Sequence, residues 1–372
     1  MRCYIRFGIF LVLAPFLLAP GTAIGRPWDL PACARVEGLT SVSYTSDEGN
    51  SYAANAGLFL PAGHGTFGIA ALGEANVLLA EFEGSIYRST DAGCSWREYA
   101  TGAVSPLRFS NSSGSVAYAW GFFPGPGIWR ANGKAGPPDR LVPCVDLPAN
   151  VLGVAVDPAD PDRVRAACSD GRIYESRDGG ASRWTPVGNA APVSSLTYFA
   201  AFDPSNLDNA VIGMARHGVF ATLDGGVTWR NASGLSSTAG PANSFNGVFS
   251  PAVSGVVYVM SLDRNESDQG APSQGRHIYR SDDGGFSFTP VVDQGGAIIL
   301  TNGPTMAADP ADSNVVYFTF GERWSLGGVY LYRYDHAAGT TTMGFDTRHS
   351  EIRSLTFNPA SSSVIYAGFE GG

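Results

Sequence analysis

The chain has 372 residues and a formal net charge of -9, with 47 glycines, 24 prolines and only 15% charged residues. This acidic balance makes nucleic acid and anionic membrane surfaces poor partners. The glycine and proline content favours a turn-rich β protein over a disordered chain, and helical periodicity is hard to find beyond the first residues.

The chain opens with a short apolar segment that is typical of a secretory signal. Arg2 and Arg6 precede the apolar run, which is too short to span a bilayer and ends in small residues near Ala23. We therefore expect residues 1–23 to be removed, which lowers the net charge to -11, and the mature protein to be secreted or periplasmic. Residues 24–38 are expected to form an N-terminal segment, and residues 39–372 the main domain.

Four cysteines remain after this segment: Cys33, Cys94, Cys144 and Cys168. An even number in an oxidising compartment permits two disulfides, and four cysteines allow three pairings. The pairing stays open, with Cys144 to Cys168 and Cys33 to Cys94 favoured. The spacings do not resemble those of a metal site, and no metal or cofactor is expected.

A short phrase recurs along the chain, as SIYRSTDAGCSW (85–96), RIYESRDGGASRW (172–184), GVFATLDGGVTW (218–229) and HIYRSDDGGFSF (277–288). Each copy lies between two strand-like runs, so it predicts a hairpin turn. The aspartate can accept hydrogen bonds from the backbone a few residues later, and the following glycine allows a positive φ. The terminal aromatic ring can fill the gap between two sheets. We therefore predict structural roles for Asp47, Asp91, Asp178, Asp224 and Asp283.

Relaxed copies of the phrase near Asp47, Asn132 and Asp335 extend the repeat to seven units, spaced 41 to 59 residues apart. Two further strands precede each hairpin, because an apolar run that ends in Asp-Pro and a second apolar run recur upstream. Four strands per unit at a period of roughly 40 to 50 residues predict the blades of a β-propeller. The fold class is therefore all-β, a single seven-bladed propeller.

The two ends of the chain each contain half of one unit. Residues 351–372 contain the first two strands of a unit, and residues 39–52 contain the last two. Joined, they complete one blade and close the ring without leaving exposed edge strands.

The repeat resembles the Asp-box, or BNR, repeat of the sialidase-like and sortilin-like propellers, and this resemblance covers nearly all of the mature chain. It implies that the aspartates lie on the face away from the sialidase active site, and that functional loops lie on the opposite face. Members of this superfamily include glycosidases, sorting receptors, photosystem assembly factors and inhibitor-like propellers, so the repeat does not select one activity. The arginine-bearing RIP motif of sialidases is absent from the sequence.

Three segments are candidates for the opposite face: the insertion 261–277, the loop 321–328 and the connection 345–353. Aromatic, acidic and guanidinium groups in such loops are typical of sugar sites, and long loops are often functional. The ligand-binding candidates are Arg216, His217, Asp263, Arg264, Arg323, Trp324, Arg348 and His349.

From these features we predict a secreted, non-catalytic, monomeric propeller that binds a protein or carbohydrate partner. The alternative is a glycoside hydrolase, sialidase-like or xyloglucanase-like, with a reduced site. Its suspected carboxylates are Glu322, Asp346 and Glu351, because hydrolysis of glycosides uses two carboxyl groups about 5 to 9.5 Å apart.

Overall fold

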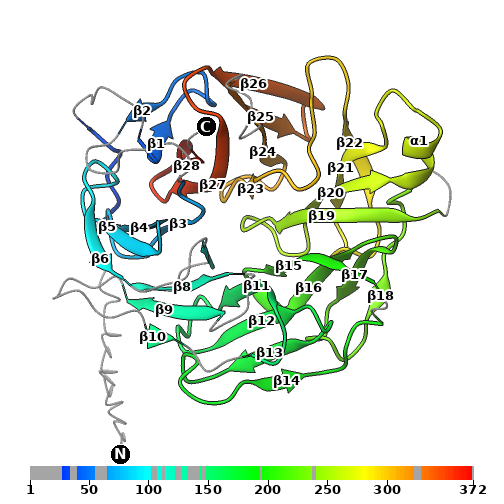
Figure 1. Ribbon diagram of the computed structural model, residues 1–372, viewed down its shortest axis with the longest axis horizontal. Coiled ribbons are helices and arrows are strands. Elements are labelled where there is room, and N and C mark those ends of the chain that lie inside the picture. Colours follow the sequence, from blue (N-terminus) through cyan, green and yellow to red (C-terminus); the bar gives the residue numbers. More distant parts are fainter. Residues whose placement is uncertain are drawn as a thin grey trace, which may run out of the picture.

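The computed structural model describes residues 27–33, 40–54, 65–101, 107–110, 114–121, 127–132, 142–143, 147–192, 195–236, 240–321 and 328–370. In these residues seven four-stranded sheets surround a central axis (Figure 1). The predicted all-β, seven-bladed propeller is therefore confirmed. In the same residues no helix is long and apolar enough to cross a membrane. The predicted signal, 1–23, lies outside the described ranges.

Each blade runs from an innermost strand near the axis to an outer strand at the rim (Figure 1). Blade 1 contains β3 (Ile69–Ala71), β4 (Leu78–Phe82), β5 (Ser85–Ser89) and β6 (Arg97–Ala100). Blade 2 contains β7 (Arg108–Phe109), β8 (Val116–Trp120), β9 (Ile128–Asn132) and β10 (Val142–Pro143). Blade 3 contains β11 (Val151–Val156), β12 (Val164–Cys168), β13 (Ile173–Ser176) and β14 (Thr185–Val187). Blade 4 contains β15 (Thr197–Asp203), β16 (Asn206–Met214), β17 (Gly218–Thr222) and β18 (Arg230–Asn231).

The remaining blades follow in the same order, and one of them carries the helix. Blade 5 contains β19 (Ala242–Phe249), β20 (Val257–Asp263), α1 (Arg264–Asp268), β21 (Arg276–Ser281) and β22 (Thr289–Asp293). Blade 6 contains β23 (Met306–Ala308), β24 (Val315–Gly321), β25 (Val329–Asp335) and β26 (Thr340–Asp346). Blade 7 contains β27 (Glu351–Asn358), β28 (Ser361–Glu370), β1 (Val42–Thr45) and β2 (Ala53–Ala54).

Blade 7 closes the ring from both ends of the chain, as predicted. Its strand order is β2-β1-β28-β27, so two N-terminal strands complete a sheet begun by the C-terminal pair. β1 pairs with β28 in antiparallel register, with Val42 opposite Gly368 and Tyr44 opposite Tyr366. The joint between the two ends is therefore a ladder of backbone hydrogen bonds inside one sheet.

The N-terminal segment connects blade 7 to blade 1. The indole N–H of Trp28 donates to the carbonyl oxygen of Leu72 over 3.2 Å, in blade 1. Asp29 exchanges hydrogen bonds with Asn76 of blade 1, and its carbonyl accepts one of 3.0 Å from Asn358 of blade 7. The segment then continues to Cys33, which forms a disulfide with Cys94.

The other favoured disulfide is not formed. Cys168 is a buried free thiol at the end of β12 and packs among the apolar side chains between blades 2 and 3. Burial raises the pKa of this thiol well above its usual range. Cys144 lies outside the described residues. The predicted pairing of Cys144 with Cys168 is therefore contradicted by the free thiol of Cys168.

The repeated aspartates hold the turns between the third and fourth strands. Asp91 accepts hydrogen bonds from the backbone N–H of Ser95 (2.9 Å) and from its hydroxyl (2.6 Å), and the Ser89 hydroxyl donates to it over 2.8 Å. The backbone N–H of Gly93 donates to the Ser89 hydroxyl over 2.9 Å, and this glycine has a φ of +88°. The same three contacts to the carboxylate recur at Asp47, Asp224 and Asp283. Asp178 likewise accepts hydrogen bonds from the side chains of Ser176 and Ser182.

The aromatic residue after each of these turns packs between neighbouring sheets. Trp96 of blade 1 lies with Val42 and Tyr366 of blade 7, and Trp184 of blade 3 lies with Val116 and Tyr118 of blade 2. Both indole rings are buried. Since aromatic side chains bury the largest apolar areas, these rings supply much of the contact that holds the blades side by side.

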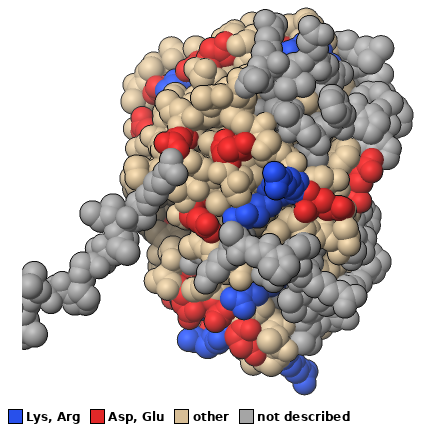
Figure 2. Space-filling view, turned by 90° about the vertical axis from the view of Figure 1, so that its left-hand side faces the viewer, with Lys and Arg blue, Asp and Glu red and all other residues tan. Residues whose placement is uncertain are grey.

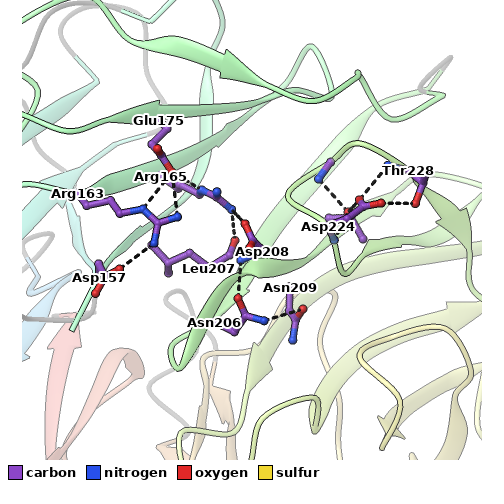
Figure 3. A network of polar contacts seen from close by, with 12 residues as sticks. Asp157, Arg163, Arg165, Glu175, Asn206, Leu207, Asp208, Asn209, Asp224 and Thr228 are labelled. Carbon is purple, nitrogen blue, oxygen red and sulfur yellow. Dashed lines mark hydrogen bonds and ion pairs between the residues drawn. The ribbon is translucent and has the colours of Figure 1, made fainter. Parts of the chain in front are cut away.

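A polar network also joins blade 3 to blade 4 (Figure 3). Arg165, in β12 and only 4% exposed, contacts Glu175 in β13 over 2.8 Å. Its Nη1 donates to the carbonyl of Leu207 and contacts Asp208, each over 2.7 Å, at the start of β16 in blade 4. The arginine thus satisfies a buried carboxylate of its own blade and a backbone carbonyl of the next blade.

Candidate binding site in the central channel

A cavity of about 510 Å³ lies on the propeller axis. All seven blades contribute to its lining through their innermost strands or the connections that lead into them, and this size is typical of ligand sites. The described lining residues include Phe67, Ile69, Arg108, Phe109, Trp120, Val151, Tyr198, Asn246, Met306, Thr319, Glu351 and Arg353.

The cavity lies toward the face opposite the aspartate turns. Its lining comes mainly from the starts of first strands, such as Ile69 and Glu351, and the ends of second strands, such as Trp120 and Gly321. In an antiparallel blade these positions share one end, whereas the aspartate turns follow the ends of third strands at the other end. The cavity therefore lies toward the face on which functional loops were predicted.

Of the described residues that line the cavity, Glu351 is the only acidic one, and Arg108 and Arg353 are the only basic ones. Arg353 contacts Glu351 over 2.7 Å and Glu370 over 2.5 Å, and its guanidinium lies 5.4 Å from the centre of the Phe67 ring. Arg108 lies 5.8 Å from the centre of the Trp120 ring. Burial within the ring and the charge of Arg353 lower the pKa of Arg108.

On the side that Figure 2 presents, described basic side chains lie next to acidic ones, and much of the described surface between them is uncharged. The channel combines charged groups and aromatic rings in one cavity.

Three predicted site residues of the 345–353 connection hold blades 6 and 7 together. Asp346 and His349 are 6% and 4% exposed, and the Nδ1 of His349 bonds to the Asp346 carboxylate. The His349 ring stacks on Phe369 with 3.7 Å between centroids. Arg348 contacts Asp346 over 3.2 Å and donates to the carbonyl of Tyr52 over 3.0 Å. Asp346, suspected as a catalytic acid, is thus engaged in the closure and does not line the cavity.

Asp346 also makes stability depend on acid pH. Burial alone would raise its pKa, but hydrogen bonds from His349 and Arg348 outweigh this and lower the pKa to about 2. The pKa values of the five turn aspartates are lowered too, through hydrogen bonds from nearby Ser and Thr groups.

Because a lowered pKa stabilises the folded state above the unfolded pKa, we expect the free energy of unfolding to fall as the pH drops from about 4 through 2. Urea unfolding at a series of pH values checks this. Asp346→Asn should be less stable at neutral pH and show a flatter dependence below pH 4; the same slope as the wild type would contradict the role of Asp346.

The insertion 261–277 is ordered and anchored to its blade. Asp263 is fully buried and caps α1 by accepting from the backbone N–H of Asn265 (2.8 Å) and Glu266 (3.3 Å). His277 contacts Glu266 over 3.0 Å and Asp293 over 2.7 Å. Arg264 contacts Asp268 at the surface over 3.7 Å. Asp263 therefore serves as a helix cap.

The other predicted ligand-binding residues are not gathered at the cavity. Arg216 and His217 are exposed in the turn between β16 and β17, with Arg216 at a φ of +66°. Glu322, Arg323 and Trp324 lie outside the described residues. Across the described ranges, no group of three or more His, Cys, Asp or Glu side chains could hold a metal ion.

No family model matches the chain. The dispase autolysis-inducing protein of Streptomyces mobaraensis is 39% identical to it over 365 residues, which cover 97% of this chain and 95% of that protein. The chain belongs to the family of this protein.

The chain is also similar, more distantly, to two other proteins. The xyloglucanase Xgh74A of Acetivibrio thermocellus is 26% identical over 240 residues, 57% of this chain but only 27% of the enzyme. A solved structure of YCF48 bound to D1 peptide has a TM-score of 0.53 and 14% identity, covering 83% of this chain and 94% of that one. The second likeness shows the propeller fold alone.

In this member of the dispase autolysis-inducing protein family, the sequence-based reasoning missed Arg108 and Trp120, whereas Arg353 lies in the predicted connection 345–353. Each arginine interrupts the apolar start of an innermost strand, in the segments LRF (107–109) and EIRSL (351–355). The corresponding strand of blade 3 begins with VLGVAV (151–156) instead. An arginine near the start of the innermost strand, present in these two units, was the signal that could have identified them.

Proposed function

We propose that this protein is a secreted, non-catalytic Asp-box propeller that binds a protein partner at the mouth of its central channel. The partner is a dispase, and binding promotes its autolysis. The observation that carries this proposal is the 39% identity to the dispase autolysis-inducing protein along nearly the whole of both chains.

The assignment to the Asp-box repeats rests on the turn geometry. Aspartates at the expected spacing bond to the backbone and hydroxyl of the residue four positions later, beside glycines at positive φ. Secretion is supported by the apolar N-terminal run and by the disulfide between Cys33 and Cys94, since disulfides persist in oxidising compartments.

The described part of the cavity supports binding over hydrolysis. Glycoside hydrolysis needs two carboxyl groups on either side of the scissile bond. Among the described lining residues only Glu351 has a carboxylate, and Arg353 already holds it over 2.7 Å. Asp346, the other described candidate, is buried against His349. The similarity to a xyloglucanase is therefore better explained by the shared propeller.

The test is to incubate dispase with the purified mature protein and to follow intact dispase on gels and its residual peptidase activity. We expect dispase to disappear severalfold faster than when it is incubated alone or with the heat-unfolded protein. An unchanged dispase lifetime would overturn the proposed partner. In parallel, reducing-sugar release from xyloglucan that is lost in Glu351→Gln would overturn the non-catalytic proposal.

A further inference from the structure

We infer that the channel mouth binds a carboxylate of the partner protein, with Arg108 as the group that pairs with it. The inference rests on the proposed function and names the chemistry by which the partner is recognised. The ligand is a single carboxylate, from either a chain end or an acidic side chain, with an apolar side chain beside it.

Arg108 differs from Arg165, Arg280 and Arg353 in that no described acidic side chain contacts it. Arg165 and Arg280 contact carboxylates over 2.8 Å and 2.7 Å, and Arg353 is held between two. Within the described part of the chain no carboxylate pairs with Arg108; its recorded contact is with the face of Trp120. Its guanidinium thus retains its donors for a ligand, in a geometry suited to two oxygens of one carboxylate.

The surroundings of Arg108 favour an incoming anion. The side chain lines a cavity to which all seven blades contribute and is exposed to solvent, and Arg353 is the nearby charge that acts on it. The positive charge of Arg353 therefore repels that of Arg108. A bound carboxylate would offset this repulsion.

The negative groups nearby restrict the ligand to one charge. Glu351 lines the same cavity, and Glu370 lies behind Arg353. Counted together, these two acids and the two arginines, Arg353 and Arg108, sum to a net charge of about zero. A phosphate dianion or a polyanion would therefore be repelled by Glu351 more strongly than a single carboxylate, which needs only the guanidinium of Arg108.

Aromatic rings define what lies next to the carboxylate. Phe67, Phe109, Trp120 and Tyr198 line the cavity and are all partly exposed. Rings in this arrangement offer apolar area and stacking faces to a ligand. The segment that enters is therefore expected to carry an aromatic or large aliphatic side chain adjacent to its carboxylate.

The experiment measures binding of short peptides by titration calorimetry and by the fluorescence of the protein. Acetyl-Gly-Phe with a free carboxylate is compared with its C-terminal amide, and acetyl-Phe-Glu-amide with acetyl-Phe-Gln-amide. At least one carboxylate peptide is expected to bind about tenfold more tightly than its neutral counterpart, as for a charge-assisted hydrogen bond. The pair that shows this difference identifies the carboxylate as a chain end or a side chain.

Arg108→Gln should reduce carboxylate binding to the level of the neutral peptides, and Arg108→Lys should retain part of it. Arg230→Gln is the matched control, because this exposed arginine also lies over an aromatic ring, 4.8 Å from the centre of Phe286, but on the outer strand β18. Equal melting temperatures of the variants establish that the ring is intact.

Equal affinity for charged and neutral peptides, or unchanged binding in Arg108→Gln, would overturn the inference. The dispase assay separates the two proposals. If Arg108→Gln loses peptide binding but still accelerates autolysis, the inference that the carboxylate site serves the partner falls while the proposed function stands. If carboxylate peptides bind and dispase is unaffected, the proposed partner falls and the site remains.

Discussion

Removal of residues 351–372 is expected to abolish the cooperative unfolding transition of the whole protein. The deletion takes away β27 and β28, and β28 is the strand that pairs with both β27 and β1. The N-terminal strands β1 and β2 then lose their sheet. The apolar side chains between blades 6 and 7 and between blades 7 and 1 lose the blade 7 residues that pack against them. Two sheet edges also become exposed.

Thermal unfolding followed by calorimetry and circular dichroism checks this, with the full-length protein as the control. We expect the truncated chain to show no sharp transition or to aggregate on purification. A truncated chain that melts cooperatively at the wild-type temperature would contradict closure by blade 7. Adding the missing segment as a peptide should restore part of the transition, because β28 supplies a strand that the remaining chain lacks.

The second large effect is expected at Arg165, whose replacement by methionine should cost about 3 kcal/mol of unfolding free energy. The substitution removes the 2.8 Å contact to the buried Glu175 and leaves the carbonyl of Leu207 without this donor. The loss is expected at the low end of the range for a broken buried ion pair, since Arg163 and Arg177 also contact Glu175.

Arg177→Met is the matched control for this prediction. Arg177 contacts the same carboxylate over 2.7 Å, but its side chain is 74% exposed, so its loss should cost less than about 1 kcal/mol. The double variant Arg165→Met, Glu175→Leu should recover part of the stability, because no buried carboxylate then remains unsatisfied. Urea unfolding measures all of these variants. Equal costs for Arg165→Met and Arg177→Met would show that burial does not set the strength of this network.

Much of the fold could be predicted because the same short turn sequence, with bonds only to nearby residues, recurs from blade to blade. The bonds that Asp91 makes lie within a few residues of it, and the glycine at positive φ is two positions away. Such turns are encoded by short segments, whatever the rest of the chain does. The half units at the two ends follow from the same repeat, so the pairing of β1 with β28 could also be predicted.

The site was less predictable because burial depends on the neighbouring blades. Asp346 and His349 stand in a polar segment of the sequence, yet both are buried where blade 6 meets blade 7. Asp263 stands in a polar insertion, yet it is buried and caps the helix within that insertion. The choice between a solvated and a buried polar side chain depends on what covers it, and the covering residues are distant in the chain.

The sequence by itself determined the all-β class, the number of blades, the aspartate turns and the way the ring closes, since all of these follow from local turn chemistry repeated along the chain. Only the tertiary structure decided which side chains share the channel. Arg108 and Arg353 lie in strands of different blades that meet only when the ring closes. Register shifts in innermost strands, between Val151 and Gly153 and between Ile352 and Ser354, also change which side chains point inward. Because one added residue reverses the alternation of a strand, strand periodicity alone could not place Arg353 in the cavity.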